Sequence, residues 1–138
     1  MEFLNKLSSN LGKLLIGLIV VFIVIGVVNG LSSDKPSEVA AAETELWSNY
    51  NKAGIYPSFS CSSLAQDKHW LVLCHPKKSA TGGLYKVKVV GENQYQINLL
   101  NGKAKTHNRH FGEVYSYDSN QSVNISKAMD DFAKEIEG

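Results

Sequence analysis

The chain opens with one long apolar run and continues with shorter segments in which apolar and polar residues alternate. Residues 14–33 contain no charged residue, and most of them are Leu, Ile, Val or Phe. As a helix, this run would be about 30 Å long, which is the thickness of the hydrocarbon core of a bilayer. A helix also satisfies its own backbone hydrogen bonds, as lipid requires. The pattern therefore predicts a transmembrane helix over residues 14–33.

Two other interpretations of residues 14–33 stay open. Lys6 and Lys13 precede the run, as basic residues precede the apolar core of a cleaved signal peptide. The best cleavage position, residues 28–30, directly follows that core, and the alanines at 40–42 lie too far downstream. The length of the run therefore favours an uncleaved signal anchor. A buried helix of a soluble protein is the weakest interpretation, because such a helix rarely needs an apolar surface on every side.

The charges beside the apolar run predict its orientation. Residues 1–13 carry two lysines, whereas Asp34 and Lys35 cancel on the other side. Because basic residues favour the cytoplasmic side, we expect residues 1–13 in the cytoplasm and residues 34–138 outside it. This arrangement is typical of a single-pass protein of the bacterial inner membrane with a periplasmic domain, which contacts the membrane through residues 14–33.

The remaining charges are balanced. The chain has 14 Lys and Arg against 13 Asp and Glu, and the excess comes from the residues before the apolar run. Residues 34–138 are therefore neutral overall. A neutral domain of this size disfavours a large or multidomain enzyme, and it disfavours a nucleic-acid binder driven by excess positive charge.

The two cysteines agree with an extracytoplasmic location. Cys61 and Cys74 flank a predicted turn and belong to no C-x-x-C pair. In an oxidising compartment, such a pair predicts one disulfide, whereas in the cytosol it would be two buried thiols. Because the signal anchor favours export, we expect the disulfide, which would stabilise the domain by roughly 3 kcal/mol.

Helical periodicity appears at both ends of the domain. Val39, Ala42, Leu46 and Tyr50 recur at helical spacing and predict a helix over residues 36–53. A second helix is predicted near the C-terminus, where apolar residues keep the same spacing and two opposite-charge pairs lie four residues apart. Those apolar positions are Ile125, Ala128, Met129, Phe132 and Ile136.

Between the helices, short apolar blocks and period-two alternation predict strands. Asn101-Gly102 is the strongest hairpin signal, because both residue types tolerate the positive φ of a type I′ turn. The predicted strands are residues 70–74, 84–90, 95–100, 103–107 and 114–117. The fold class is therefore α+β: an N-terminal transmembrane helix, then a helix, an antiparallel meander of four to five strands and a C-terminal helix, with the helices on one sheet face.

Two groups of residues are candidate contacts for a partner. If strands 84–90 and 103–107 both flank strand 95–100, their lysines share a face that suits an acidic partner or anionic lipid, although such lysines also protect sheet edges from pairing. Two tyrosines share one face of the last strand and mark a protein contact if no helix covers them. These candidates are Lys86, Lys88, Lys103, Lys105, Tyr115 and Tyr117.

Candidate chemistry is sparse. His107 and His110 are three residues apart and are weak candidates for zinc ligands, because no carboxylate lies nearby in the sequence. A serine between residues 58 and 63 could serve as a nucleophile, but no G-x-S-x-G elbow is present. Cys74 beside His75 would need a free thiolate, which a disulfide removes. We therefore expect no enzyme activity and no cofactor.

These observations favour a membrane-anchored binding or adaptor protein, an accessory subunit of an envelope assembly whose protein partners lie in or near the membrane. An immunity factor, or a factor that excludes phages or plasmids, is the alternative. A metal-dependent hydrolase is a third and weaker hypothesis. The anchor would hold the domain close to such a partner and raise its effective concentration.

Overall fold

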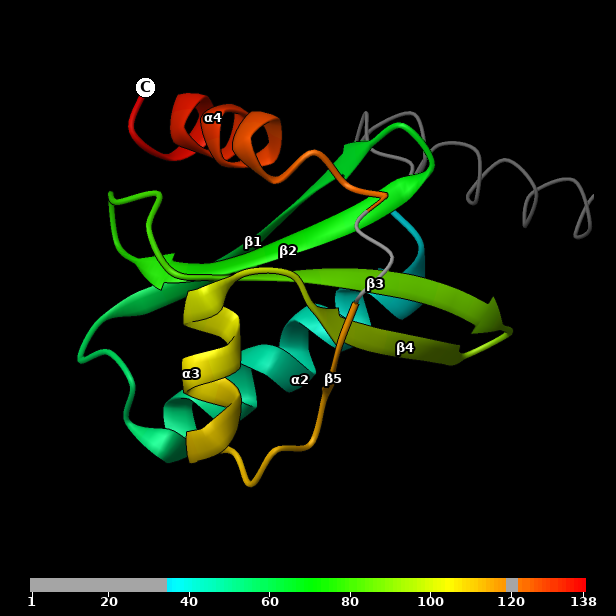
Figure 1. Cartoon of the computed structure of the whole chain (residues 1–138), viewed down its shortest axis with the longest axis horizontal. Helices are drawn as coiled ribbons and strands as arrows, with labels where there is room; N and C mark the ends of the chain where they lie inside the picture. The colour runs from blue at the N-terminus through cyan, green and yellow to red at the C-terminus, as the bar shows by residue number, and fades with distance from the viewer. Residues whose placement is uncertain (1–34, 119–121) are drawn as a thin grey trace, which may run out of the picture. The chain divides into compact units, whose positions relative to one another are not determined.

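A five-stranded sheet forms the centre of the domain (Figure 1). The computed structural model describes residues 35–118 and 122–138, so the predicted transmembrane segment at 14–33 lies outside the described residues. Within the described part of the chain, no helix has the length and apolar character needed to cross a bilayer. Residues 36–138 form one unit.

The strands follow one another in space as they do in sequence, in the order β1-β2-β3-β4-β5. Three antiparallel pairings join the first four strands, whereas β5 runs parallel to β4. The meander is therefore antiparallel through β4 only. The strands are β1 (Phe59–Gln66), β2 (His69–Pro76), β3 (Gly83–Gly91), β4 (Gln94–Leu99) and β5 (Ser116–Tyr117).

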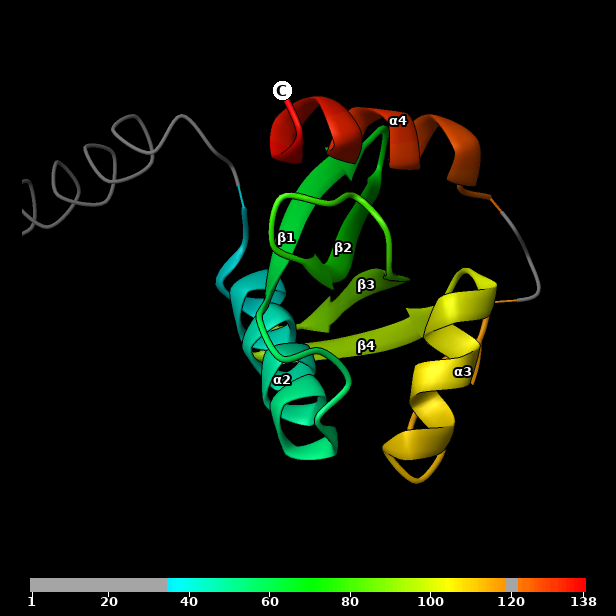
Figure 2. The same ribbon diagram turned by 90° about the vertical axis from the view of Figure 1, so that its left-hand side faces the viewer.

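Helices cover both faces of this sheet, which corrects the prediction of one covered face. The helices are α2 (Ser37–Ala53), α3 (Gly102–His110) and α4 (Ile125–Ile136). Figure 2 shows α4 on the opposite side of the sheet from α2 and α3. Strand β2 explains this arrangement, because its apolar run alternates between the faces. Val72 and Cys74 belong to the core under α2, and Leu71 and Leu73 belong to the core under α4.

The two predicted terminal helices are confirmed. Helix α2 buries Val39, Ala42, Leu46 and Tyr50, which are the four positions that the periodicity selected. It ends at Gly54, whose φ of 64° lies in the left-handed region that glycine adopts without strain. Helix α4 buries Ala128 and Phe132, and Asn124 caps its first turn by accepting a hydrogen bond from the backbone N–H of Lys127.

The predicted hairpin at Asn101-Gly102 is wrong, because residues 102–110 form helix α3. Asn101 is the N-cap of this helix and has an extended backbone, with φ −130°. Its Oδ1 accepts hydrogen bonds from the backbone N–H of Ala104 and of Leu84, and its Nδ2 donates to the carbonyl of Gly82. The same residue type that favours a tight turn also favours a helix start.

The sheet contains β1, which was not predicted, and does not contain the predicted strand at residues 103–107. The residues of β1 were not among the predicted strands, yet β1 pairs with β2 from Phe59↔Pro76 to Gln66↔His69. At the far end of β1, Gln66 exchanges two hydrogen bonds with the backbone N–H and C=O of Asn124. These bonds fix the start of α4 against the edge of the sheet.

Candidate functional site

Among the described residues, the outer edge of β1 is unpaired and lacks the charges, proline and bulge that protect many sheet edges. Strand β1 is the first of the five, and within the described residues nothing pairs with it on the side away from β2. Natural edges are usually kept short or are protected by lysine, proline or a bulge. Strand β1 has eight residues, no charge, no proline and a regular register with β2. It is therefore a continuous strip of backbone donors and acceptors.

The disulfide identifies which backbone groups face outward. Cys61 and Cys74 are bonded, as predicted, and their Cα atoms are 4.0 Å apart. In an antiparallel pair, such a short separation marks residues whose N–H and C=O groups point away from the partner strand. The pattern alternates along the strand, and Pro76, which has no N–H, fits the same kind of position opposite Phe59. The outward groups therefore belong to Phe59, Cys61, Ser63 and Ala65.

An apolar feature lies beside this edge. The Trp47 side chain on α2 is 45% exposed and stacks on Phe59, with ring centroids 5.6 Å apart. Next to the indole is a hollow of about 260 Å³ that is lined by Glu43, Thr44, Trp47 and Cys61. The β1 edge and this hollow form a surface that offers backbone hydrogen bonds together with one recess for a side chain.

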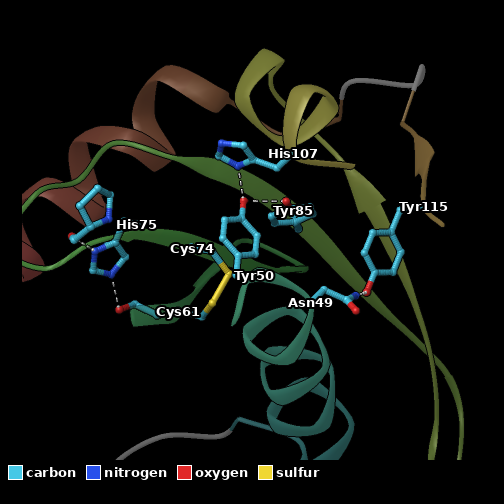
Figure 3. The surroundings of a disulfide bond; sticks show 10 residues. Asn49, Tyr50, Cys61, Cys74, His75, Tyr85, His107 and Tyr115 are labelled. Atoms are coloured by element: carbon cyan, nitrogen blue, oxygen red, sulfur yellow. Dashed lines mark hydrogen bonds between the residues drawn. A yellow bond between two sulfur atoms is a disulfide. The ribbon is translucent and has the colours of Figure 1, made fainter. Parts of the chain in front are cut away.

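Behind the edge, a buried polar network joins α2, β3 and α3 (Figure 3). The Tyr50 hydroxyl is hydrogen-bonded to the Tyr85 hydroxyl at 2.8 Å and to Nδ1 of His107 at 2.6 Å. The Tyr50 ring also packs against Tyr56, Phe59 and Phe111. Burial raises the pKa of both Tyr50 and Tyr85. These hydrogen bonds fix the end of α2, which packs against β1 through Tyr50 and Phe59.

His107 makes this network sensitive to acid. Burial, and then the positive charges of Lys103 and His110, lowers the pKa of His107 to about 4 from its usual 6.5. Between these values the unfolded chain binds more protons than the folded one, so stability falls as pH falls from 6.5 to 4. We expect a loss of at most about 3 kcal/mol across this window, measured by chemical denaturation at several pH values. The variant His107→Gln should have a smaller free energy of unfolding at pH 7, but this free energy should fall less between pH 6.5 and 4 than in the wild type. An equal fall in the variant would contradict the role of His107 in the acid sensitivity.

The predicted lysine face does not form, because residues 102–110 are helical. Lys86 and Lys88 lie on β3, whereas Lys103 and Lys105 lie on α3. Lys86 is mostly buried and forms an ion pair with Asp118, and the Lys105 ammonium lies 3.6 Å from the centre of the Tyr117 ring. The role of these residues in binding a partner stays a prediction.

The two candidate tyrosines lie in different surroundings. The Tyr115 hydroxyl donates to Glu45 Oε2 at 2.6 Å and accepts from Asn49 Nδ2 at 2.6 Å, so this side chain packs against α2. Burial, followed by its bond to Glu45, raises the pKa of Tyr115. Tyr117 is 41% exposed, and its ring contacts the Lys105 ammonium of α3. A helix therefore covers Tyr115, and the role of the two tyrosines in a protein contact stays a prediction.

The structure shows the surroundings of two candidate chemistries, a zinc site at His107 and a serine nucleophile. His107 Nδ1 is engaged by Tyr50, and within residues 35–118 and 122–138 no three His, Cys, Asp or Glu side chains are grouped to hold a metal ion. The Ser62 hydroxyl lies 2.9 Å from Nε2 of His75, a distance that suits a nucleophile and its base. However, His75 Nδ1 is bonded to the carbonyl of Pro76 and not to a carboxylate.

Sequence reasoning missed the β1 edge because the serine-rich segment has no strong strand periodicity. The signal that could have found it is the disulfide, since a cross-strand pair at Cys61 and Cys74 requires a strand on each side of the turn.

A scan of family models and searches of curated proteins and of solved structures found no match to this chain.

Proposed function

We propose that this chain is a single-pass membrane-anchored binding protein of the cell envelope that docks an extended segment of another envelope protein at the edge of β1. The anchor is residues 14–33, the N-terminus faces the cytoplasm and the domain lies in the periplasm. The observation that carries the proposal is the eight-residue, uncharged and unprotected edge of β1. The chain serves as an adaptor or accessory subunit and performs no chemistry itself.

The hydrogen-bonding pattern supports an added strand. An extended peptide that joins a sheet edge forms main-chain hydrogen bonds with alternate residues of that edge. On β1 these residues are Phe59, Cys61, Ser63 and Ala65, whose backbone groups are directed away from β2. Because β1 carries no charge, the paired segment of the partner is expected to be uncharged as well.

The hollow beside Trp47 supplies selectivity for a side chain. Main-chain pairing alone accepts almost any sequence, so specificity comes from recesses that receive particular side chains. The hollow of about 260 Å³ is small, and Trp47 and Cys61 are its apolar lining residues beside Glu43 and Thr44. We expect the partner to place one apolar side chain there, and half-exposed tryptophans are frequent energetic centres of interfaces.

Ser63 offers a test of the added strand. Proline at position 63 removes an outward N–H and leaves the inward hydrogen bonds to β2 intact, so Ser63→Pro is expected to weaken partner binding at least tenfold. A photoreactive side chain at Thr44, which lines the hollow, reports binding in the native membrane. We expect an adduct of a second protein in the wild-type background, strong loss of it with Ser63→Pro, and retention with the matched control Ser63→Ala.

A second photoreactive position controls for location. Thr106 is exposed on α3, away from β1, and should give no such adduct. Sequencing of the adduct should identify one extended, uncharged segment in the partner. An adduct at Thr106 but not Thr44, an adduct unaffected by Ser63→Pro in a chain of normal melting temperature, or an adduct with a second copy of this chain would contradict the proposal.

A further inference from the structure

A second hollow lies where the domain begins. Its volume is about 510 Å³, and its wall contains Pro36, which precedes the first residue of α2. Figure 1 shows the β1–β2 turn, the start of α2 and the β3–β4 turn at the same end of the domain. The lining residues are Pro36, Lys68, His69, Trp70, Lys86, Val87, Lys88, Val89 and Ser122.

The charges in this hollow are positive. Three lysines line it, and no carboxylate is among the described residues of its wall. The charge of Lys86 is compensated by Asp118. By contrast, neither Lys68 nor Lys88 forms an ion pair within the described part of the chain. Two ammonium groups at the hollow are therefore available for an anion.

The same end of the domain is also apolar. Trp70 contributes to the wall, and the two valines near the end of β3 are unusually exposed: Val89 by 40% and Val90 by 52%. Tryptophan and lysine together are typical of the membrane interface, where the indole lies at the level of the headgroups and the ammonium reaches the phosphates. The surface thus combines apolar side chains with ammonium groups, and both are bound by the headgroup layer of a membrane.

Chain length limits how far this hollow can be from the membrane. The uncharged run ends at Ser33, and Pro36 is three residues later. Three extended residues span about 10 Å. If residues 14–33 cross the bilayer, as the proposed function requires, the end of the domain that contains Pro36 must lie close to the headgroups of the outer leaflet.

We propose that the hollow lined by Lys68, Trp70 and Lys88, with the exposed Val89 in its wall, binds the phosphate headgroups of anionic phospholipids in the membrane that anchors the chain. This inference rests on the proposed anchor but not on the binding of a partner at β1. Its consequence is a preferred orientation of the domain, with α2 starting at the membrane surface.

The test uses the full chain in lipid nanodiscs at physiological salt. Discs of neutral phosphatidylcholine are compared with discs that contain phosphatidylglycerol, and a lipid with a gadolinium-chelating headgroup broadens the NMR signals of nearby amides. We expect the amides of Lys68 and Lys88 to broaden at least twofold more in the anionic discs. Lys68→Glu/Lys88→Glu should abolish this difference, and Lys103→Glu/Arg109→Glu, an equal change of charge on α3, should preserve it.

The outcomes separate the two proposals. A chain that enters neither type of disc contradicts the anchor, and with it the lipid contact. A chain that enters both but shows equal broadening, or an effect removed equally by the α3 variant, overturns the lipid contact alone. Inorganic phosphate added to neutral discs should not shift the Lys68 and Lys88 signals; a saturable shift there, without an effect of the anionic lipid, would assign the hollow to a free anion instead.

Discussion

Gly82→Ala is expected to destabilise the domain by about 3 kcal/mol or more, which lowers the melting temperature by roughly 12–25 °C. Gly82 has φ +143°, a conformation that residues with a side chain rarely adopt. A Cβ atom at this position would lie 2.0 Å from the carbonyl oxygen of Cys74, which belongs to β2. The obstacle is backbone within the sheet, so no side-chain movement relieves it. Thermal unfolding followed by circular dichroism measures the effect.

Gly102→Ala is the matched control. Gly102 is the first residue of α3, it has no positive φ, and a Cβ atom there would have no neighbour within 4 Å. Alanine is the better helix former by up to about 1 kcal/mol, so the melting temperature should stay the same or rise slightly. If Gly82→Ala melted like Gly102→Ala, the close approach of the β2–β3 connection to β2 would be wrong.

Reducing the disulfide is expected to cost about 3 kcal/mol of stability, or roughly 12–25 °C in melting temperature. The bond closes a loop between residues 61 and 74 and joins β1 to β2, and Cys74 is completely buried. Without the bond, the unfolded chain gains conformational freedom that folding must remove. Melting curves with and without a reductant, with free thiols counted to verify reduction, measure the loss.

The variant Cys61→Ala/Cys74→Ala separates the bond from the reagent. It should melt close to the reduced wild-type protein and should not respond to reductant. A fully reduced wild-type chain with an unchanged melting temperature would show that the loop between β1 and β2 is already restricted by the hairpin itself. In that case the disulfide would contribute little to stability.

The sequence predicted those elements whose burial is periodic. Helices α2 and α4 bury residues at helical spacing, and the alternation in 84–90 and 95–100 predicted β3 and β4. The disulfide followed from the number of cysteines and the expected compartment. For these helices and strands the pattern required by burial is local, so it is visible in a single sequence.

Two elements were missed because the decisive interactions join distant residues. Asn101-Gly102 is compatible with a hairpin and with a helix start, and bonds from Asn101 to Leu84 and Gly82 select the helix. Strand β1 has weak strand propensity, and its pairing with β2 overrides that propensity. The β1 edge could not be predicted, because an edge is defined by the order of strands in space.

Amide hydrogen exchange along β1 tests the central claim most directly. In the purified full chain, the outward amides of Cys61, Ser63 and Ala65 are expected to exchange rapidly, while the inward amides of Ser62 and Leu64 are protected by β2. In the assembly isolated from native membranes, the three outward amides should become protected as well. Outward amides that are already protected in the purified chain, or that stay unprotected in the assembly, would contradict the docking of a partner strand at β1.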